Sequence, residues 1–176
     1  MRNILLATAA ISLFAVPAMA QTISTPQWSG SAGYTALDAD GADLGAITGR
    51  VTARLHPNFA VEGEASIGVR DDDVTVAGVN AKVEHDYDAA AYAVGILPVS
   101  PNFELFGRVG YGTTSIKAEA AGVRAEADGE SVNYGVGGNY FFDARNGVRA
   151  DWTRRDFTDD NGGEVDTYGV SYVRRF

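Results

Sequence analysis

The residues of this sequence best suited to catalysis are its two histidines, His56 and His85. A nucleophilic hydrolase needs a histidine paired with a serine or an aspartate in one site. Neither histidine has a serine at near spacing. Next to His85, the acidic residues Glu84, Asp86 and Asp88 would share the opposite face of a strand, because neighbouring residues alternate between faces. The sequence therefore predicts a solvated strand end at this point, no catalytic residues and no enzyme.

Acidic and glycine-rich segments could in principle hold a metal ion or a phosphate group. The runs 71–73 and 159–164 have the composition of divalent-cation binders, but they lack the twelve-residue spacing of a dedicated calcium loop. No glycine cluster is followed by a helix start, which a phosphate-binding loop requires. We therefore expect no metal site and no cofactor.

Composition excludes several further classes of protein. The 176 residues include 14 Lys and Arg against 23 Asp and Glu, a formal net charge of −9, and no Cys. Nucleic-acid binding needs a clustered basic face, which this balance disfavours. Disulfides, thiol catalysis and zinc–cysteine sites are excluded by the absence of cysteine.

The first twenty residues have the layout of an export signal. Arg2 supplies a positive charge, residues 4–16 form a short apolar stretch, and Ala18-Met19-Ala20 is a small-x-small cleavage motif. We expect a cleaved signal peptide over residues 1–20 and a single domain over residues 21–176.

The remainder of the chain alternates with period two, which is typical of β-strands, and shows no helical period. Turn residues divide it into eight strands, over residues 28–38, 44–55, 59–70, 81–97, 103–116, 130–142, 147–157 and 164–176. Three connections are tight, at 56–58, 98–102 and 143–146, where Asn146-Gly147 is a hairpin signal. The other four, at 39–43, 71–80, 117–129 and 158–163, are acidic and contain glycine. Short turns on one side and longer loops on the other are the layout of an outer-membrane barrel.

The two faces of these strands decide between a membrane barrel and a soluble one. The polar face carries charged residues of both signs, arginines and carboxylates: Arg50, Arg54, Glu62, Glu64, Glu104, Arg108, Arg149, Asp151 and Arg155. Only two lysines occur in the chain, whereas a soluble surface would use lysine freely, and arginine forms geometrically fixed ion pairs. Aromatic residues of the apolar face lie near strand ends, as in the girdles of membrane barrels. We therefore expect an apolar exterior and a lumen filled by a charge network of these nine residues.

The chain resembles the small eight-stranded outer-membrane barrels of Gram-negative bacteria, the OmpA/OmpX-like and porin-family group, over essentially the whole segment 21–176. The resemblance rests on the signal peptide, the acidic loops, the repeated Pro-Asn-Phe turns and the last strand. There, a terminal aromatic and alternating apolar residues match the signal read by the barrel assembly machinery, namely Tyr168, Val170, Tyr172 and Phe176. The resemblance implies a closed, all-β, antiparallel, up-and-down transmembrane barrel in the cell outer membrane.

The sequence predicts the function of the protein less specifically than its fold. We expect a monomer with a structural or surface-interaction role, in membrane integrity, adhesion or contact with lipopolysaccharide. Outer-membrane lipid, lipopolysaccharide and the assembly machinery are the expected partners, with the 117–129 loop as the binding tip and Arg154 as a contact for lipid phosphate. A small or transient pore and a soluble, periplasmic, lipocalin-like ligand-binding barrel stay open as alternatives.

Overall fold

The computed structural model describes residues 25–39, 42–70, 72–76, 79–120, 123–158 and 163–176. For residues 39, 42, 43, 70, 72–76, 79–86, 115–120 and 123–128, the description covers the backbone alone. The predicted signal peptide and most of the acidic run 159–164 lie outside the described residues, and so do the side chains of His85 and of the run 71–73. Within the described residues, no helix is long and apolar enough to cross a membrane.

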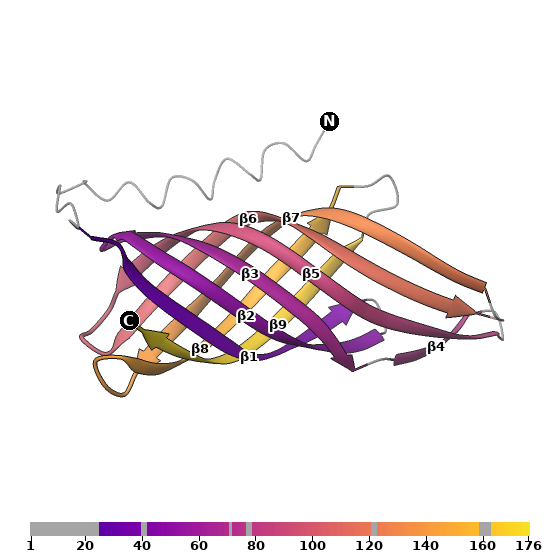
Figure 1. Ribbon diagram of the computed structural model, residues 1–176, viewed down its shortest axis with the longest axis horizontal. Coiled ribbons are helices and arrows are strands. Elements are labelled where there is room, and N and C mark those ends of the chain that lie inside the picture. Colours follow the sequence, from indigo (N-terminus) through magenta and orange to yellow (C-terminus); the bar gives the residue numbers. More distant parts are fainter. Residues whose placement is uncertain (1–24, 40–41, 71, 77–78, 121–122, 159–162) are drawn as a thin grey trace.

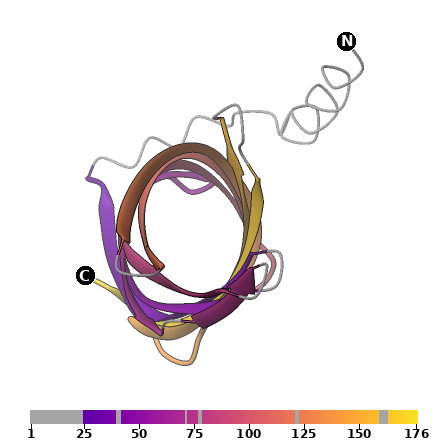
Figure 2. The same ribbon diagram turned by 90° about the vertical axis from the view of Figure 1, so that its right-hand side faces the viewer.

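The described chain is a closed antiparallel β-barrel (Figures 1 and 2). Its strands are β1 (Gln27–Ala39), β2 (Ala42–His56), β3 (Phe59–Arg70), β4 (Asp72–Val76), β5 (Val79–Pro98), β6 (Phe103–Ala120), β7 (Val123–Phe141), β8 (Asn146–Phe157) and β9 (Glu164–Arg175). Neighbours in sequence pair up and down, β1 pairs with β9, and β3 pairs with β5 to close the ring. Eight strands form the wall, as the sequence predicts, because β4 pairs with β5 beside the ring.

The two ends of the barrel differ in their connections (Figure 1). The start of β1 and the end of β9 lie at the end that carries the three tight turns, which we call the turn end. The four other connections lie at the opposite end, the hairpin end. There β5, β6 and β7 extend beyond the other strands.

Two predicted loops are wrong in their extent. The segment 71–80 contains β4 and the start of β5, and the segment 117–129 is mostly strand, because β6 runs to Ala120 and β7 starts at Val123. Acidic and glycine-containing composition predicts a loop here, but backbone pairing between β6 and β7 continues without interruption to Ala120↔Val123. The Asn146-Gly147 pair also lies within β8 rather than in the turn before it.

The turn before β8 is built by an aspartate. The Asp143 carboxylate accepts hydrogen bonds from the backbone N–H groups of Arg145 (2.7 Å) and Asn146 (2.6 Å) and from the Asn146 amide. The Asn146 side-chain donor, followed by the two backbone donors, lowers the pKa of Asp143 below its ordinary value.

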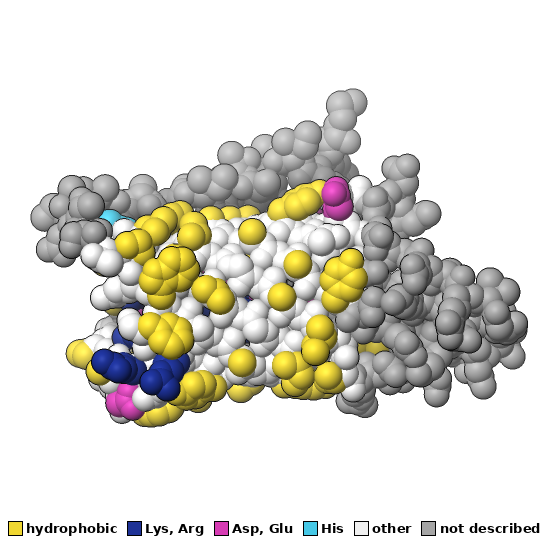
Figure 3. Space-filling view, viewed as in Figure 1, with side chains coloured by type: hydrophobic (Ala, Val, Ile, Leu, Met, Phe, Trp, Pro, Cys, Tyr) yellow, Lys and Arg dark blue, Asp and Glu magenta, His cyan; other side chains and the backbone are white. Residues whose placement is uncertain are grey.

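The wall has an apolar outer face and a polar inner face. Large apolar side chains alternate outward along the strands, as with Val61 and Ile67 of β3 and Val170 of β9, which is 65% exposed. Figure 3 shows apolar side chains spread over the visible exterior, with charged ones near the ends of the described surface. A soluble lipocalin-like barrel would need the opposite arrangement, with an apolar interior and a polar exterior.

Candidate functional site

The middle of the lumen holds a network of buried charges, which we call the central network. It contains four arginines and four carboxylates: Arg50, Arg108, Arg149, Arg155, Glu62, Glu64, Asp88 and Asp151. None of the eight is more than 7% exposed. The formal charges balance, which is what makes burial of so many ions tolerable in a narrow lumen.

Glu64 of β3 is the most connected carboxylate of the central network. It accepts hydrogen bonds from Arg50 Nε at 2.6 Å, Arg108 Nη1 at 2.7 Å and Arg155 Nη2 at 3.3 Å. The Tyr92 hydroxyl donates a fourth at 3.2 Å. Arg50 and Tyr92 lie on β2 and β5, the two strands that flank β3, whereas Arg108 and Arg155 reach Glu64 across the lumen.

Arg108 of β6 crosses the lumen and connects three carboxylates. Its guanidinium donates to Glu62 (3.1 Å) and Glu64 (2.7 Å) through Nη1, and to Asp151 (3.0 Å) through Nη2. The same group lies over the Tyr92 ring, 4.4 Å from its centroid. A planar fork of five donors suits this multiple bonding, which explains the preference for arginine over lysine.

Arg149 of β8 closes the central network toward the turn end. It forms a two-pronged ion pair with Glu62, at 2.6 and 3.0 Å, and its Nε donates to Asp151 at 3.0 Å. Its guanidinium stacks 4.2 Å from the centroid of the Phe106 ring. Phe106 belongs to an apolar layer with Ala60, Tyr92, Val94 and Ile96 on that side.

Toward the hairpin end, the charges give way to neutral side chains. Thr35, Thr48 and Ser66 form a chain of hydroxyl hydrogen bonds across β1, β2 and β3, at 2.8 and 2.9 Å. Beyond them, Leu37 and Leu44 pack in a small buried cluster. Within the described residues, the lumen is therefore filled in layers by side chains, as expected for eight strands.

Eight of the nine residues predicted for the lumen charge network are buried inside the barrel, and Arg54 is partly exposed near its turn end. Arg54 and Glu104 pair with each other there rather than with the central network. From the sequence, Arg50 and Arg54 lie on the polar face of the strand that precedes Glu62 and Glu64, so either arginine is expected to face one of these two carboxylates. This holds for Arg50 and Glu64, but Arg54 Nη2 lies 2.6 Å from Glu104.

Asp88 is the charged member of the central network that the sequence analysis missed. It is buried and pairs with Arg155 at 2.8 Å, so its assignment to a solvated strand end was wrong. The register between β5 and β6 shifts between His85 and Tyr87, which makes Asp86 an extra residue. Such a bulge changes the parity of the strand and separates Asp88 from the face of Glu84.

The predicted assembly signal lies on the outer face. Tyr168, Val170, Tyr172 and Phe176 are between 47% and 79% exposed. The Tyr172 hydroxyl also hydrogen-bonds the Asn146 side chain on β8.

Arg154 lies on the outer face as well, near the hairpin end. It donates to Asp166 at 2.8 and 2.9 Å and to Glu164 at 2.7 Å, so several of its donors already have acidic partners. Its contact with lipid phosphate stays a prediction.

No group of three or more metal-ligating side chains is placed to hold an ion among the described residues. The arrangement in the lumen is that of a structural plug, in which every charged group of the central network is paired with opposite charge.

The fold and its inside-out polarity define a class, the small membrane-spanning β-barrels. The sequence matches the family described as "Outer membrane protein beta-barrel domain" over residues 6–176, so the chain belongs to this outer-membrane family. No curated protein matches the sequence.

Solved structures show the same fold at low sequence identity. Ail, the attachment invasion locus protein of Yersinia pestis, is 18% identical, with a TM-score of 0.63 over 86% of this chain and 99% of Ail. OprG of Pseudomonas aeruginosa is 11% identical, with a TM-score of 0.65 over 86% of this chain and 96% of OprG. The N-terminal barrel domain of OprF from the same organism is 13% identical, with a TM-score of 0.58 over 85% of this chain and 98% of that domain.

Proposed function

We propose that the barrel is an anchor and that the protruding strands at its hairpin end bind a partner at the cell surface. The observation that carries this proposal is the length of β5, β6 and β7. The ring closes only as far as Ile67↔Tyr87 between β3 and β5, and β7 pairs with β8 only from Ser131↔Phe157. Pairing between β6 and β7 continues beyond this level to the hairpin at 120–123.

These strands form a sheet of four, β4-β5-β6-β7, outside the closed ring. Along residues 123–129 of β7, no described strand pairs with the edge that faces away from β6, whereas the next carbonyl, of Glu130, accepts from the Thr158 N–H at 2.9 Å. At about 3.3 Å per residue, the open edge is about 23 Å long. An unpaired edge of this kind can add a strand from another protein, with main-chain hydrogen bonds supplying the affinity.

The net negative charge of the protruding segments supports a partner protein with a basic surface. In segments 70–86 and 115–130, acidic residues outnumber basic ones by nine to four. A structure of Ail contains the heparin analogue sucrose octasulfate. The acidic balance of the protruding segments in this chain disfavours a polyanion and favours a partner with basic side chains beside its own strand edge.

The experiment is an adhesion assay with bacteria that display either the whole chain or a variant in which 118–125 is replaced by Asn-Gly. Adhesion is measured to epithelial monolayers and to wells coated with polylysine or heparin. We expect the replacement to lower adhesion to monolayers and to polylysine, with little adhesion to heparin in either case. The heat-dependent gel shift of the variant serves as the control that the barrel still folds.

Unchanged adhesion of the folded variant would contradict the proposal. If a null strain instead becomes sensitive to detergent and the truncated variant restores resistance, the barrel serves membrane integrity. That second role is supported by the filled lumen and the apolar exterior. The remaining expectations belong to the same proposal: a monomer that contacts lipopolysaccharide and is recognised by the assembly machinery through β9, after export on its signal peptide.

A further inference from the structure

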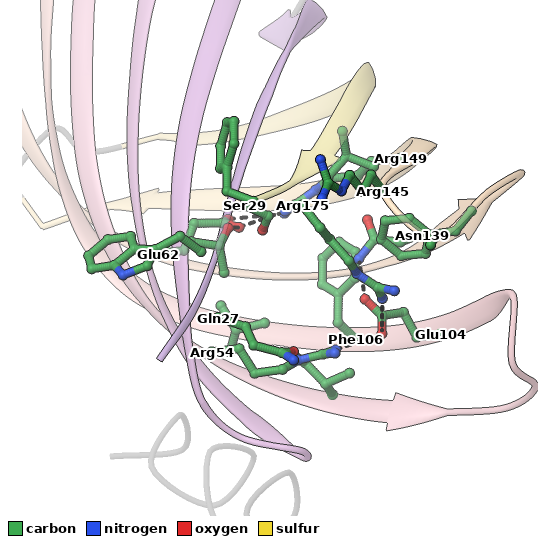
Figure 4. A pocket seen from close by; sticks show the side chains of 18 residues that line it. Gln27, Ser29, Arg54, Glu62, Glu104, Phe106, Asn139, Arg145, Arg149 and Arg175 are labelled. Carbon is green, nitrogen blue, oxygen red and sulfur yellow. Dashed lines mark hydrogen bonds and ion pairs between the residues drawn. The ribbon is translucent and has the colours of Figure 1, made fainter. Parts of the chain in front are cut away.

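The turn end of the lumen contains a cavity of about 320 Å³ that the central network does not fill. All eight strands of the ring contribute to its lining, from Ser29 on β1 to Arg175 on β9, so it lies inside the barrel. Figure 4 shows this cavity from close by. The Glu62–Arg149 ion pair and Phe106 line it on the side of the central network.

Arginine is in excess around this cavity. Arg54 and Arg175 bind the same carboxylate oxygen of Glu104, at 2.6 and 3.1 Å. Arg145, in the turn before β8, also lines the cavity, and no carboxylate of the described chain pairs with its guanidinium. Arg149 also lines the cavity, but it forms ion pairs with Glu62 and Asp151 of the central network and is not part of this excess. Outside the central network, the lining therefore contains three guanidinium groups and one carboxylate, with two of the three bound to it.

Within the described residues, most N–H donors of Arg54 and Arg175 have no hydrogen-bond partner. A guanidinium has five N–H donors. The structure gives Arg54 and Arg175 one hydrogen bond each, both to Glu104. Glu104 itself also accepts from the Asn139 amide at 3.1 Å. Several charged donors in a partly desolvated site are therefore available to an incoming oxyanion, with which arginine forms strong, two-pronged hydrogen bonds.

Apolar surface lies directly beside the unused donors. The Arg175 guanidinium stacks 3.4 Å from the centroid of the Phe141 ring, and the buried Phe106 ring lines the same cavity. A cavity of this size is at the lower end of the range for small-molecule sites. Aromatic walls next to clustered positive charge suit a ligand with one anionic group and one small apolar group.

We propose that this cavity binds a small organic oxyanion, a carboxylate or phosphate that carries a ring or a short apolar chain. Arg54, Arg145 and Arg175 hold the oxyanion, while Phe106 and Phe141 contact the apolar part. The site lies at the opposite end of the barrel from the protruding sheet. In the orientation with short turns inside, it opens to the periplasm. It is therefore independent of the surface function proposed above.

The test is isothermal titration of the full barrel in zwitterionic lipid nanodiscs with phenyl phosphate, with empty nanodiscs as the blank. We expect binding by the unmodified chain and a loss of affinity of about tenfold or more in Arg145→Gln and in Arg175→Gln, as for a lost charge-assisted hydrogen bond. Arg154→Gln, at the hairpin end, is the matched control and should bind normally. Arg145 lies in an exposed turn, so its variant tests the site even if Arg175→Gln does not fold.

Two further probes separate the parts of the proposal. Inorganic phosphate should bind more weakly than phenyl phosphate, and neutral benzamide should not bind. Absence of phenyl phosphate binding, equal binding by benzamide, or unchanged affinity in the folded Arg145→Gln variant would each overturn the oxyanion site. Equal affinity for inorganic phosphate and phenyl phosphate would overturn the apolar part.

Discussion

Removal of the Glu62 carboxylate should destabilise the barrel by about 3 kcal/mol. Glu62 is 3% exposed and accepts four hydrogen bonds, two from Arg149, one from Arg108 and one from the Thr52 hydroxyl. Breaking a buried ion pair from one side costs about 3–5 kcal/mol, because a charge is left buried without its partner. In Glu62→Ala the central network would carry one uncompensated positive charge.

The loss of unfolding free energy in Glu62→Ala should fall at the lower end of the range for a broken buried ion pair, because the two arginines keep other partners. Arg149 keeps Asp151 at 3.0 Å, and Arg108 keeps Glu64 at 2.7 Å and Asp151 at 3.0 Å. Glu62 also lines the cavity at the turn end, so water can approach the Arg149 guanidinium once the carboxylate is gone. Glu64→Ala removes one ion-pair partner from each of three arginines, against two for Glu62→Ala, and Glu64 lies outside the lining of that cavity, so its removal should cost more.

The assay is urea unfolding in phospholipid vesicles, followed by tryptophan fluorescence. Asp156→Asn, an exposed carboxylate on β8, is the matched control and should change stability by less than about 0.5 kcal/mol. The double variant Glu62→Ala/Arg149→Met removes one charge of each sign and should recover part of the loss. A loss below about 1 kcal/mol for Glu62→Ala, or a double variant less stable than the single one, would refute ion pairing as the source of lumen stability.

Three further predictions concern the backbone, the turn and the plug. A Cβ at Gly33 would lie 2.1 Å from a carbonyl oxygen of β9, so Gly33→Ala should slow barrel closure in a gel-shift folding assay, whereas Gly63→Ala, with nothing within 4 Å, should fold normally. The lowered pKa of Asp143 stabilises the fold above the ordinary aspartate pKa of about 4 and is lost as pH falls below it, so the difference in urea midpoint between the unmodified chain and Asp143→Asn should shrink in acid. Removal of Arg108, which bridges three carboxylates, leaves both space and a net negative charge. Arg108→Ser should therefore give a cation-selective conductance in planar bilayers that the unmodified chain lacks; equal conductance of both would favour the small-pore alternative.

The alternation of side chains was enough to predict the wall and the content of the lumen. In β3, Val61 and Ile67 face out while Glu62 and Glu64 face in, because lipid and lumen impose opposite polarity on successive residues. An ion pair between adjacent strands could also be predicted from the sequence, because Arg50 and Glu64 are direct register partners on β2 and β3.

Pairing across the lumen was not predictable from sequence. Arg54 pairs with Glu104, fifty positions further along the chain, and Arg155 pairs with Asp88. In an interior just wide enough for side chains to fill, an inward-facing residue meets partners across the barrel as well as along the wall. The strand pattern fixes which residues face inward but not which of them meet.

The extent of the protruding strands was missed for a related reason. Beyond the ring, no lipid acts on one face, so the alternation of apolar and polar residues that identifies a membrane strand is no longer required. Residues 117–120 and 123–129 are rich in alanine and acidic residues and carry little strand signal, yet they pair in register. Their backbone hydrogen bonds to the neighbouring strand are not visible in a single-strand sequence pattern.

The distribution of charge gives the three levels of the lumen different roles. In the central network, four arginines meet four carboxylates, so the charges compensate one another and can take the place of an apolar core. At the turn end, three arginines and the single carboxylate of Glu104 line the cavity outside the central network, and this excess of positive charge is tolerable only where water or an anion has access. At the hairpin end, the charges inside are replaced by hydroxyl groups and leucines, while the acidic residues lie in the segments outside the ring. Balanced charge in the central network stabilises the fold. The excess of arginine at the turn end and of acidic residues at the hairpin end does not contribute to stability in this way, and we therefore propose that ligands bind at these two ends.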